Sequence, residues 1–123
     1  MLSVKETGLL LNIIKHCEKI NEKMNGLTKE QMIADEDVLQ IICFNILQIG
    51  ELSKNFSPQF IATYNGVPWR QIKGMRDKVA HGYGTIDKDR VWSTALKDIN
   101  PLLTYCQQII ADNDSDQQKN QIS

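Results

Sequence analysis

Apolar residues recur at three- and four-residue steps along almost the whole chain, which is the period of an amphipathic α-helix. No strand period and no internal repeat stands out. The sequence therefore predicts an all-α fold. The first helix covers about residues 3–24, with its apolar stripe at Leu9, Leu10, Ile13, Ile14, Cys17, Ile20 and Met24.

Cap and turn signals divide the first half of the chain into three helices. The pair Asn25-Gly26 ends the first helix. Thr28 begins Thr-Lys-Glu-Gln, a capping-box pattern that predicts a short helix ending near Ala34. Asp35 can cap the next helix, which we expect to run to about Lys54.

This third helix is the most apolar segment, because hydrophobic residues between 38 and 52 cover more than one of its faces. Such a helix is either central in a bundle or faces a second subunit. Asn45 and Glu51 are polar positions within or beside the stripe, and we expect them to form hydrogen bonds between helices. Gly50 lowers helix stability, so it suggests close approach by another element.

Prolines and a capping aspartate divide the second half. A short helical turn starts at Pro58, and Pro68 can begin a helix over 68–80. Asp87 can cap a last long helix, which Pro101 should kink or end near Asp98. Beyond residue 111 the chain is almost entirely polar, so we expect a helical domain over 1–111 and a disordered polar tail over 112–123.

The composition is that of one domain without a membrane segment. The chain has 123 residues, of which 41% are hydrophobic and 24% charged. No apolar run reaches the roughly 18 residues of a membrane span, and the N-terminus lacks the pattern of a signal peptide. Cys17, Cys43 and Cys106 are widely spaced, as is typical of reduced, buried thiols. We therefore expect a cytoplasmic protein.

One short segment carries the groups most suited to chemistry. Arg76 and His81 are five positions apart, Tyr83 follows, and Gly82 lies between them. Positions five apart on a helix point about 140° from each other, so the two side chains can converge only if the helix ends before His81. The alternative is an ordinary helix end, with the histidine near the last carbonyls and the arginine paired with Asp77 or another acid.

The same region is locally basic. Residues 70–90 hold six lysines and arginines against three aspartates, a sum of +3 on a chain whose net charge is −1. A basic segment of this kind suits a ligand that carries phosphate, and Arg70, Lys73 and Lys78 are the candidates for binding it. A solvated helix surface would have the same charge pattern.

Several short motifs occur in an order that resembles the HepT family of HEPN-domain toxins. The resemblance spans roughly residues 5–110 and is more specific than the Arg-x4-His-x-Tyr motif alone. Its elements are Ile49-Gly50-Glu51, Val67-Pro68-Trp69-Arg70, Gly74-Met75-Arg76-Asp77, His81-Gly82-Tyr83, Ile86-Asp87 and Val91-Trp92.

The resemblance implies an antiparallel bundle of four to five helices that forms a homodimer, with two Arg-His motifs facing one cleft. It implies a metal-independent endoribonuclease whose catalytic residues are Arg76 and His81. Asp77 and Tyr83 would support the site. It also implies a partner, a minimal nucleotidyltransferase antitoxin of the MntA type, which transfers AMP to Tyr83.

The chemistry of RNA cleavage fits these residue types. The 2′-hydroxyl of RNA is the nucleophile, so the protein must supply a base, an acid and positive charge at the phosphate. Histidine exchanges protons near pH 7 and arginine grips phosphate oxygens with its fork. The other histidine, His16, lies on the first helix and outside the motif.

The remaining function class is a non-catalytic helical module that binds RNA or nucleotides, or that serves mainly as the partner of a nucleotidyltransferase. Metal-free RNA cleavage distinguishes the two classes. No His, Asp and Glu cluster has the spacing of metal ligands, so a metal-dependent enzyme is disfavoured and we expect no cofactor.

Overall fold

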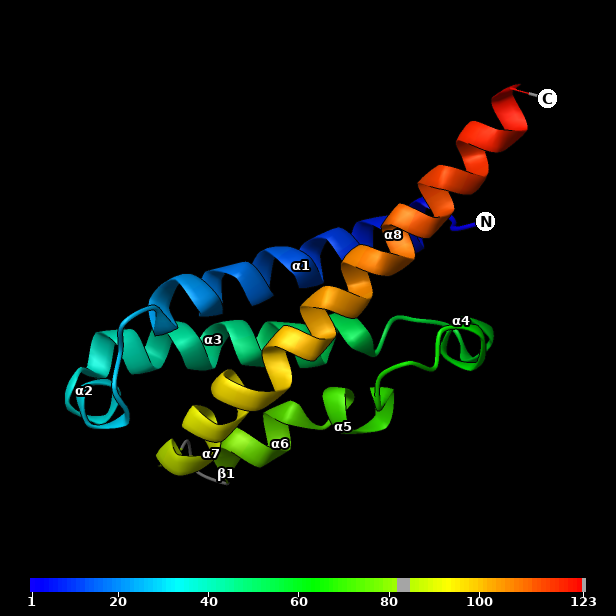
Figure 1. Ribbon diagram of the computed structural model, residues 1–123. Coiled ribbons are helices and arrows are strands. Elements are labelled where there is room, and N and C mark those ends of the chain that lie inside the picture. Colours follow the sequence, from blue (N-terminus) through cyan, green and yellow to red (C-terminus); the bar gives the residue numbers. More distant parts are fainter. Residues whose placement is uncertain (82–84, 123) are drawn as a thin grey trace.

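The backbone of residues 1–81 and 85–122, and the side chains of residues 1–77 and 85–114, are described by a computed structural model. Three long helices dominate it: α1 (Val4–Met24), α3 (Glu36–Ser53) and α8 (Ile99–Ile122). Figure 1 shows α1 and α3 side by side in opposite directions, with α8 running back along α1. The predicted all-α bundle is confirmed.

The helix boundaries in the first half follow the predicted caps. The backbone of Gly26 has φ +73°, a left-handed conformation that suits glycine at the turn after α1. Thr28 and Gln31 form the reciprocal capping box of α2 (Lys29–Ala34). The side chain of Asp35 accepts a hydrogen bond from the Val38 amide and so caps α3.

The segment expected to be one helix over 68–80 is two shorter helices. α5 (Trp69–Lys73) and α6 (Met75–Val79) are separated at Gly74, whose ψ of 2° leaves the helical region. Glycine has the weakest helix preference after proline, so the break falls there at little cost. Together with α4 (Pro58–Thr63), this break divides the bundle more finely than four to five helices.

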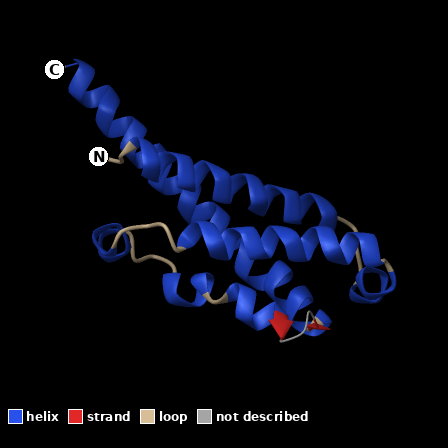
Figure 2. Ribbon diagram, turned by 180° about the vertical axis from the view of Figure 1, so that it is seen from behind, coloured by secondary structure: helices blue, strands red, loops and turns tan. Residues whose placement is uncertain are grey.

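A small hairpin follows α6. Strand β1 (Ala80–His81) pairs antiparallel with β2 (Thr85–Ile86), and Figure 2 shows both strands at one end of the molecule. The helix therefore ends before His81, as the motif required. Two-residue strands are too short to show a period in the sequence, which explains why no strand was predicted.

The predicted interruption of the last helix is confirmed, although its form is different. Asp87 caps α7 (Lys88–Ser93), and a π-helical segment, η2 (Thr94–Asp98), connects it to α8. Pro101 lies in the first turn of α8, directly after this π-helical segment.

The polar C-terminal segment is helical in the structure. Helix α8 runs through Ile122, and the division into a helical domain over 1–111 and a disordered tail over 112–123 stays a prediction. No glycine or proline follows Pro101, and the side-chain amide of Asn113 donates to the Ile109 carbonyl (2.8 Å) and the Tyr64 hydroxyl (3.3 Å). The second bond connects α8 to the residue that follows α4.

The centre of the bundle is α3, which packs against α1, α2, α5, α6 and α7. Its wide apolar surface is thus covered mainly by helices of the same chain. The buried apolar side chains of α3 are Leu39, Ile42, Cys43, Ile46 and Ile49. All three cysteines are free and buried, as predicted, and burial raises the pKa of the Cys106 thiol to about 12.

An aromatic cluster fixes the segment that leads into α5. The rings of Phe56 and Phe60 stack at 4.1 Å, and Trp69 lies 5.1 Å from Phe56. The indole N–H of Trp69 donates to the Tyr64 carbonyl. Because α5 is anchored in this way, the position of α6 is determined as well.

Within the described residues, no helix is long and apolar enough to cross a membrane.

The predicted close approach at Gly50 is confirmed. A β-carbon there would lie 3.5 Å from the carbonyl oxygens of Ile72 and Lys73 and 3.7 Å from the Arg76 nitrogen. These distances admit a methyl group and nothing larger, because the neighbours are backbone atoms.

We predict that Gly50→Leu lowers the free energy of unfolding by about 1–3 kcal/mol, the usual cost of overpacking. Gly50→Ala should be tolerated. Gly8→Leu is the matched control, since a β-carbon at Gly8 meets nothing within 4 Å. Urea unfolding followed by circular dichroism measures all three, and equal stability of the two leucine variants would contradict the close approach.

Candidate functional site

Arg76 lies on α6 with its side chain directed to α3. Its Nη1 donates to Oε1 of Glu51 at 3.4 Å, and the Arg76 side chain remains 59% exposed. Nζ of Lys54 donates to the same oxygen at 3.0 Å. One carboxylate thus bridges two cations, and the predicted hydrogen bond between Glu51 and another helix is confirmed, with Arg76 as the donor.

The two cations act unequally on Glu51. The hydrogen bond and charge of Lys54 lower the pKa of the Glu51 carboxyl, and Arg76 lowers it further by a smaller amount. An exposed ion pair at 3.4 Å is weak, because solvent screens it and ordering the side chains costs entropy. Glu51 therefore holds the arginine near α3 without binding it tightly, so an incoming anion can compete for the guanidinium.

The other candidates on α5 and α6 lie in the same part of the fold. Asp77 is exposed, and its amide donates to the Gly74 carbonyl at 3.0 Å, just after the break between the helices. Arg70 is exposed and Lys73 half-buried on α5. Lys78 belongs to α6 by its backbone, and its side chain lies outside the described residues.

His81 is placed by its backbone alone. It pairs with Thr85 in the hairpin, and β1 begins directly after α6 ends at Val79. The side chain of His81 and the whole of Tyr83 lie outside the described residues. The structure thus puts Arg76 in the first turn of α6 and the His81 backbone in the short strand that follows that helix.

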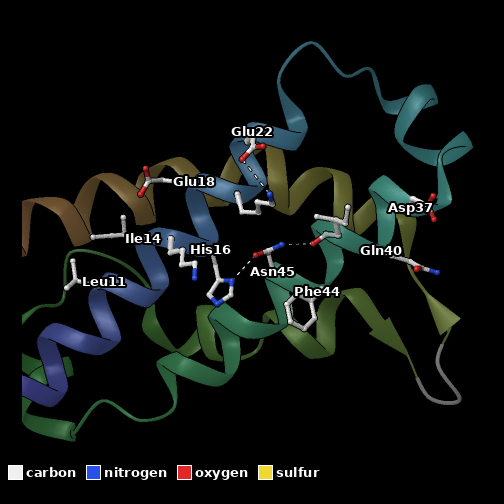
Figure 3. A pocket seen from close by; sticks show the side chains of 12 residues that line it. Leu11, Ile14, His16, Glu18, Glu22, Asp37, Gln40, Phe44 and Asn45 are labelled. Carbon is white, nitrogen blue, oxygen red and sulfur yellow. Dashed lines mark hydrogen bonds and ion pairs between the residues drawn. The ribbon is translucent and has the colours of Figure 1, made fainter.

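A groove between α1 and α3 was not predicted from the sequence. Figure 3 shows His16, Phe44 and Asn45 inside it. Its volume is about 1130 Å³. Nδ1 of His16 lies 2.7 Å from Oδ1 of Asn45, and the Asn45 amide donates to the Ile41 carbonyl at 2.7 Å. The predicted interhelical hydrogen bond of Asn45 is confirmed. This polar residue inside an apolar stripe is the one feature of the sequence that could have indicated the groove.

The described residues include no group of three His, Cys, Asp or Glu side chains that could hold a metal ion. What the site offers is positive charge: a solvent-accessible guanidinium, held by a displaceable carboxylate, beside a basic helix pair. Such a group binds phosphate oxygens.

Comparison with known proteins assigns the class. The family described as "Ribonuclease HepT-like" matches residues 13–109. Because this match covers most of the chain, including α6 and the hairpin, the protein belongs to the HepT-like ribonuclease family.

Named relatives agree with this membership. "Putative RNase TTE0752" from Caldanaerobacter subterraneus is 32% identical over 101 residues, which cover 82% of this chain and 90% of the relative. "Probable ribonuclease HepT" from Thermococcus cleftensis is 31% identical over 93 residues, 76% of this chain and 84% of the relative. "Putative RNase MJ0127" from Methanocaldococcus jannaschii is 26% identical over 105 residues, covering 85% and 87%. No solved structure matches.

The shared carboxylate leads to a prediction about its titration. Lys54→Gln should raise the pKa of Glu51 towards its ordinary value of 4.5 by more than Arg76→Gln does, because Lys54 is the larger cause of the lowering. Lys19→Gln is the matched control, since it breaks a similar i,i+3 pair with Glu22 elsewhere. An NMR titration of the Glu51 carboxyl carbon measures the shifts.

The lowered pKa of Glu51 also makes the stability of the folded protein depend on pH. A depressed pKa adds stability that is complete above pH 4.5 and disappears as the pH falls through the lowered value. If Arg76→Gln raises the pKa of Glu51 more than Lys54→Gln does, Glu51 is bound mainly to the arginine. That result would contradict the shorter distance from Glu51 to Lys54.

Proposed function

We propose that this chain is the toxin of a toxin–antitoxin pair and acts as a metal-independent endoribonuclease, with Arg76 and His81 as its catalytic residues. Membership of the HepT-like ribonuclease family is the observation that carries the proposal. The exposed Arg76 guanidinium on α6, together with the strand that contains His81 and directly follows this helix, supports it.

The proposed reaction is an internal transesterification of RNA. A base removes the 2′-hydroxyl proton, and the oxygen attacks the adjacent phosphorus. The bond from phosphorus to the 5′-oxygen then breaks, and an acid protonates the leaving oxygen. The products are a 2′,3′-cyclic phosphate and a 5′-hydroxyl. His81 carries the protons, and Arg76 stabilises the charge on the pentavalent phosphate.

We propose a homodimer because the reaction needs both a base and an acid. One chain supplies one motif histidine, whereas the reaction needs a base and an acid at the same phosphate. Two copies bring two of each group to one cleft. Arg70, Lys73, Lys78 and Asp77 then border the cleft, where the three cations would hold neighbouring phosphates.

Within this mechanism Glu51 is a positioning residue for Arg76. It keeps the guanidinium against α3 in the absence of RNA, and the substrate phosphate takes its place when RNA binds. The weak 3.4 Å contact and the 59% exposure of the arginine side chain suit such an exchange.

We predict that the purified chain cleaves cellular RNA in EDTA and that His81→Ala lowers the rate by roughly 10²–10⁴-fold, the usual contribution of a general acid or base. Arg76→Lys should also be slow, because lysine keeps the charge and loses the fork. Lys5→Ala, which removes an exposed cation on the first turn of α1, should cleave like wild type.

Cleavage by His81→Ala at the wild-type rate would contradict the assignment of that residue. If folded wild-type protein with unmodified Tyr83 does not cleave RNA, the non-catalytic binding module becomes the better description. Circular dichroism and the intact mass of each protein establish folding and modification.

The proposal also includes the antitoxin, a minimal nucleotidyltransferase of the MntA type that transfers AMP to the Tyr83 hydroxyl. The oxygen attacks the α-phosphorus of ATP, pyrophosphate leaves, and a phosphodiester forms. The added nucleotide places negative charge and bulk beside Arg76 and His81 in the sequence, which would oppose binding of an RNA phosphate.

We predict that co-expression with such a transferase adds the mass of one AMP to the Tyr83 peptide and abolishes RNA cleavage. Tyr83→Phe should gain no mass and should stay active, because the phenol oxygen is the acceptor. Tyr105→Phe is the control, as its hydroxyl is bound to the Gly66 amide at 2.9 Å. AMP on another residue would refute this switch.

A further inference from the structure

We infer that Lys54 binds a phosphate of RNA and that it forms, together with Arg76, one anion site between the end of α3 and α6. This inference rests on the proposed function, which supplies the RNA. It adds a cation from α3 to those on α5 and α6. Lys54 is the C-cap residue of α3 and lies outside the basic segment over 70–90, so folding places it beside Arg76.

Two cations meet at one oxygen atom of the Glu51 carboxylate. Nζ of Lys54 lies 3.0 Å from Oε1 of Glu51, and Nη1 of Arg76 lies 3.4 Å from the same atom. The two cationic groups are therefore separated by a single acceptor atom. A phosphate group carries negative charge and oxygen acceptors, as a carboxylate does. A phosphate that takes the place of Glu51 can therefore contact both cations.

Both cations keep hydrogen-bond donors for such a ligand. An ammonium group has three N–H donors and a guanidinium has five. In the described part of the chain, Lys54 and Arg76 each donate one side-chain hydrogen bond, to Glu51. The Lys54 side chain is 50% exposed, so solvent and ligands reach it. Two positive charges against one negative charge leave the cluster net positive, which attracts a phosphate backbone.

Other groups already fill the usual role of a lysine at a helix C-terminus, which is to donate to the last carbonyls. The Glu51 and Leu52 carbonyls accept from the backbone amides of Lys54 and Asn55. The side-chain amide of Asn55 also donates to the Glu51 carbonyl, at 3.1 Å. Carbonyls that are bound in this way present less negative charge to an incoming phosphate. The Lys54 ammonium is thus not needed to cap α3.

The backbone that carries Lys54 is anchored, although the ammonium is exposed. The preceding residue, Ser53, is fully buried, and its hydroxyl donates to the Ile49 carbonyl at 2.7 Å. Two residues after Lys54, the buried ring of Phe56 stacks on Phe60. A binding group on an anchored backbone loses less entropy when a ligand orders it, so this position suits phosphate binding.

The salt dependence of RNA binding tests the role of Lys54. Each phosphate contact releases bound counterions, so losing one contact lowers the slope of log affinity against log salt by about 0.7 for a single strand. The probe is a short, fluorescently labelled single-stranded RNA whose 2′-hydroxyl groups are methylated, which prevents cleavage through them. Fluorescence anisotropy measures its binding in EDTA at several KCl concentrations.

Lys54→Gln should lower the salt slope by about 0.7. It should also weaken binding roughly tenfold at low salt, the effect of losing one charge-assisted hydrogen bond. Lys54→Arg should keep the wild-type slope, because arginine keeps the charge. Lys19→Gln is the matched control and should bind like wild type, since Lys19 forms a similar exposed i,i+3 pair with Glu22 on α1. Circular dichroism should show that all variants are folded, because exposed ion pairs contribute little to stability.

A double-mutant cycle with Glu51→Gln separates direct contact from an indirect effect. Direct contact predicts that Lys54→Gln lowers the slope equally with Glu51 or Gln at position 51. If Lys54 only neutralises Glu51, Lys54→Gln will change nothing in the Glu51→Gln protein, and the inference is overturned. A wild-type slope in Lys54→Gln, or failure of the folded wild-type protein to bind the probe, would overturn it as well.

Cleavage of unmodified RNA separates this inference from the proposed function. A slope that depends on Lys54, in a wild-type protein that cleaves no RNA, supports the anion site and refutes the ribonuclease. Cleavage by a wild-type protein whose slope is unaffected by Lys54→Gln supports the ribonuclease and refutes the role of Lys54. If both hold, Lys54→Gln should raise KM and leave kcat nearly unchanged, because a phosphate contact is made equally in the ground state and the transition state.

Discussion

The close approach of the α5–α6 backbone to α3 at Gly50 determines the surroundings of Arg76, the arginine of the proposed site. A β-carbon at this position would touch the carbonyl oxygens of Ile72 and Lys73. Because glycine has no β-carbon, the backbone of the α5–α6 segment can pack directly against α3. The next residue, Glu51, then reaches Arg76 on α6. Packing at one position therefore decides which carboxylate the arginine meets.

The arrangement combines a rigid support with a displaceable contact. Aromatic rings and the Trp69 hydrogen bond fix α5, and buried apolar residues fix α3, so the backbone around Arg76 is well anchored. The guanidinium itself is exposed and bound only by an exposed carboxylate that Lys54 shares. A ribonuclease of the HepT-like family would need these two properties together, because phosphate must displace Glu51 without moving the helix.

Local signals in the sequence predicted the helices well and their subdivision less well. The caps at Thr28, Asp35 and Asp87 and the turn at Gly26 act within a few residues, so the sequence alone reveals them. The backbone on both sides of the break at Gly74 packs against Gly50, and no local pattern shows this contact between distant segments. The groove likewise needs two helices to form, and the exposure of Phe44 follows from which helices cover α3. The roles of His81 and Tyr83 come from the family resemblance, since their side chains lie outside the described residues.

The ends of the RNA products test the central claim most directly. RNA cut by the wild-type protein in EDTA would be analysed for its terminal groups, with a substrate that carries a single 2′-deoxy nucleotide at the cleavage site as a companion. We expect 2′,3′-cyclic phosphate and 5′-hydroxyl ends, and no cleavage of the deoxy substrate, because the 2′-hydroxyl is the nucleophile. Products with 5′-phosphate ends, or cleavage at the deoxy position, would contradict the proposed mechanism.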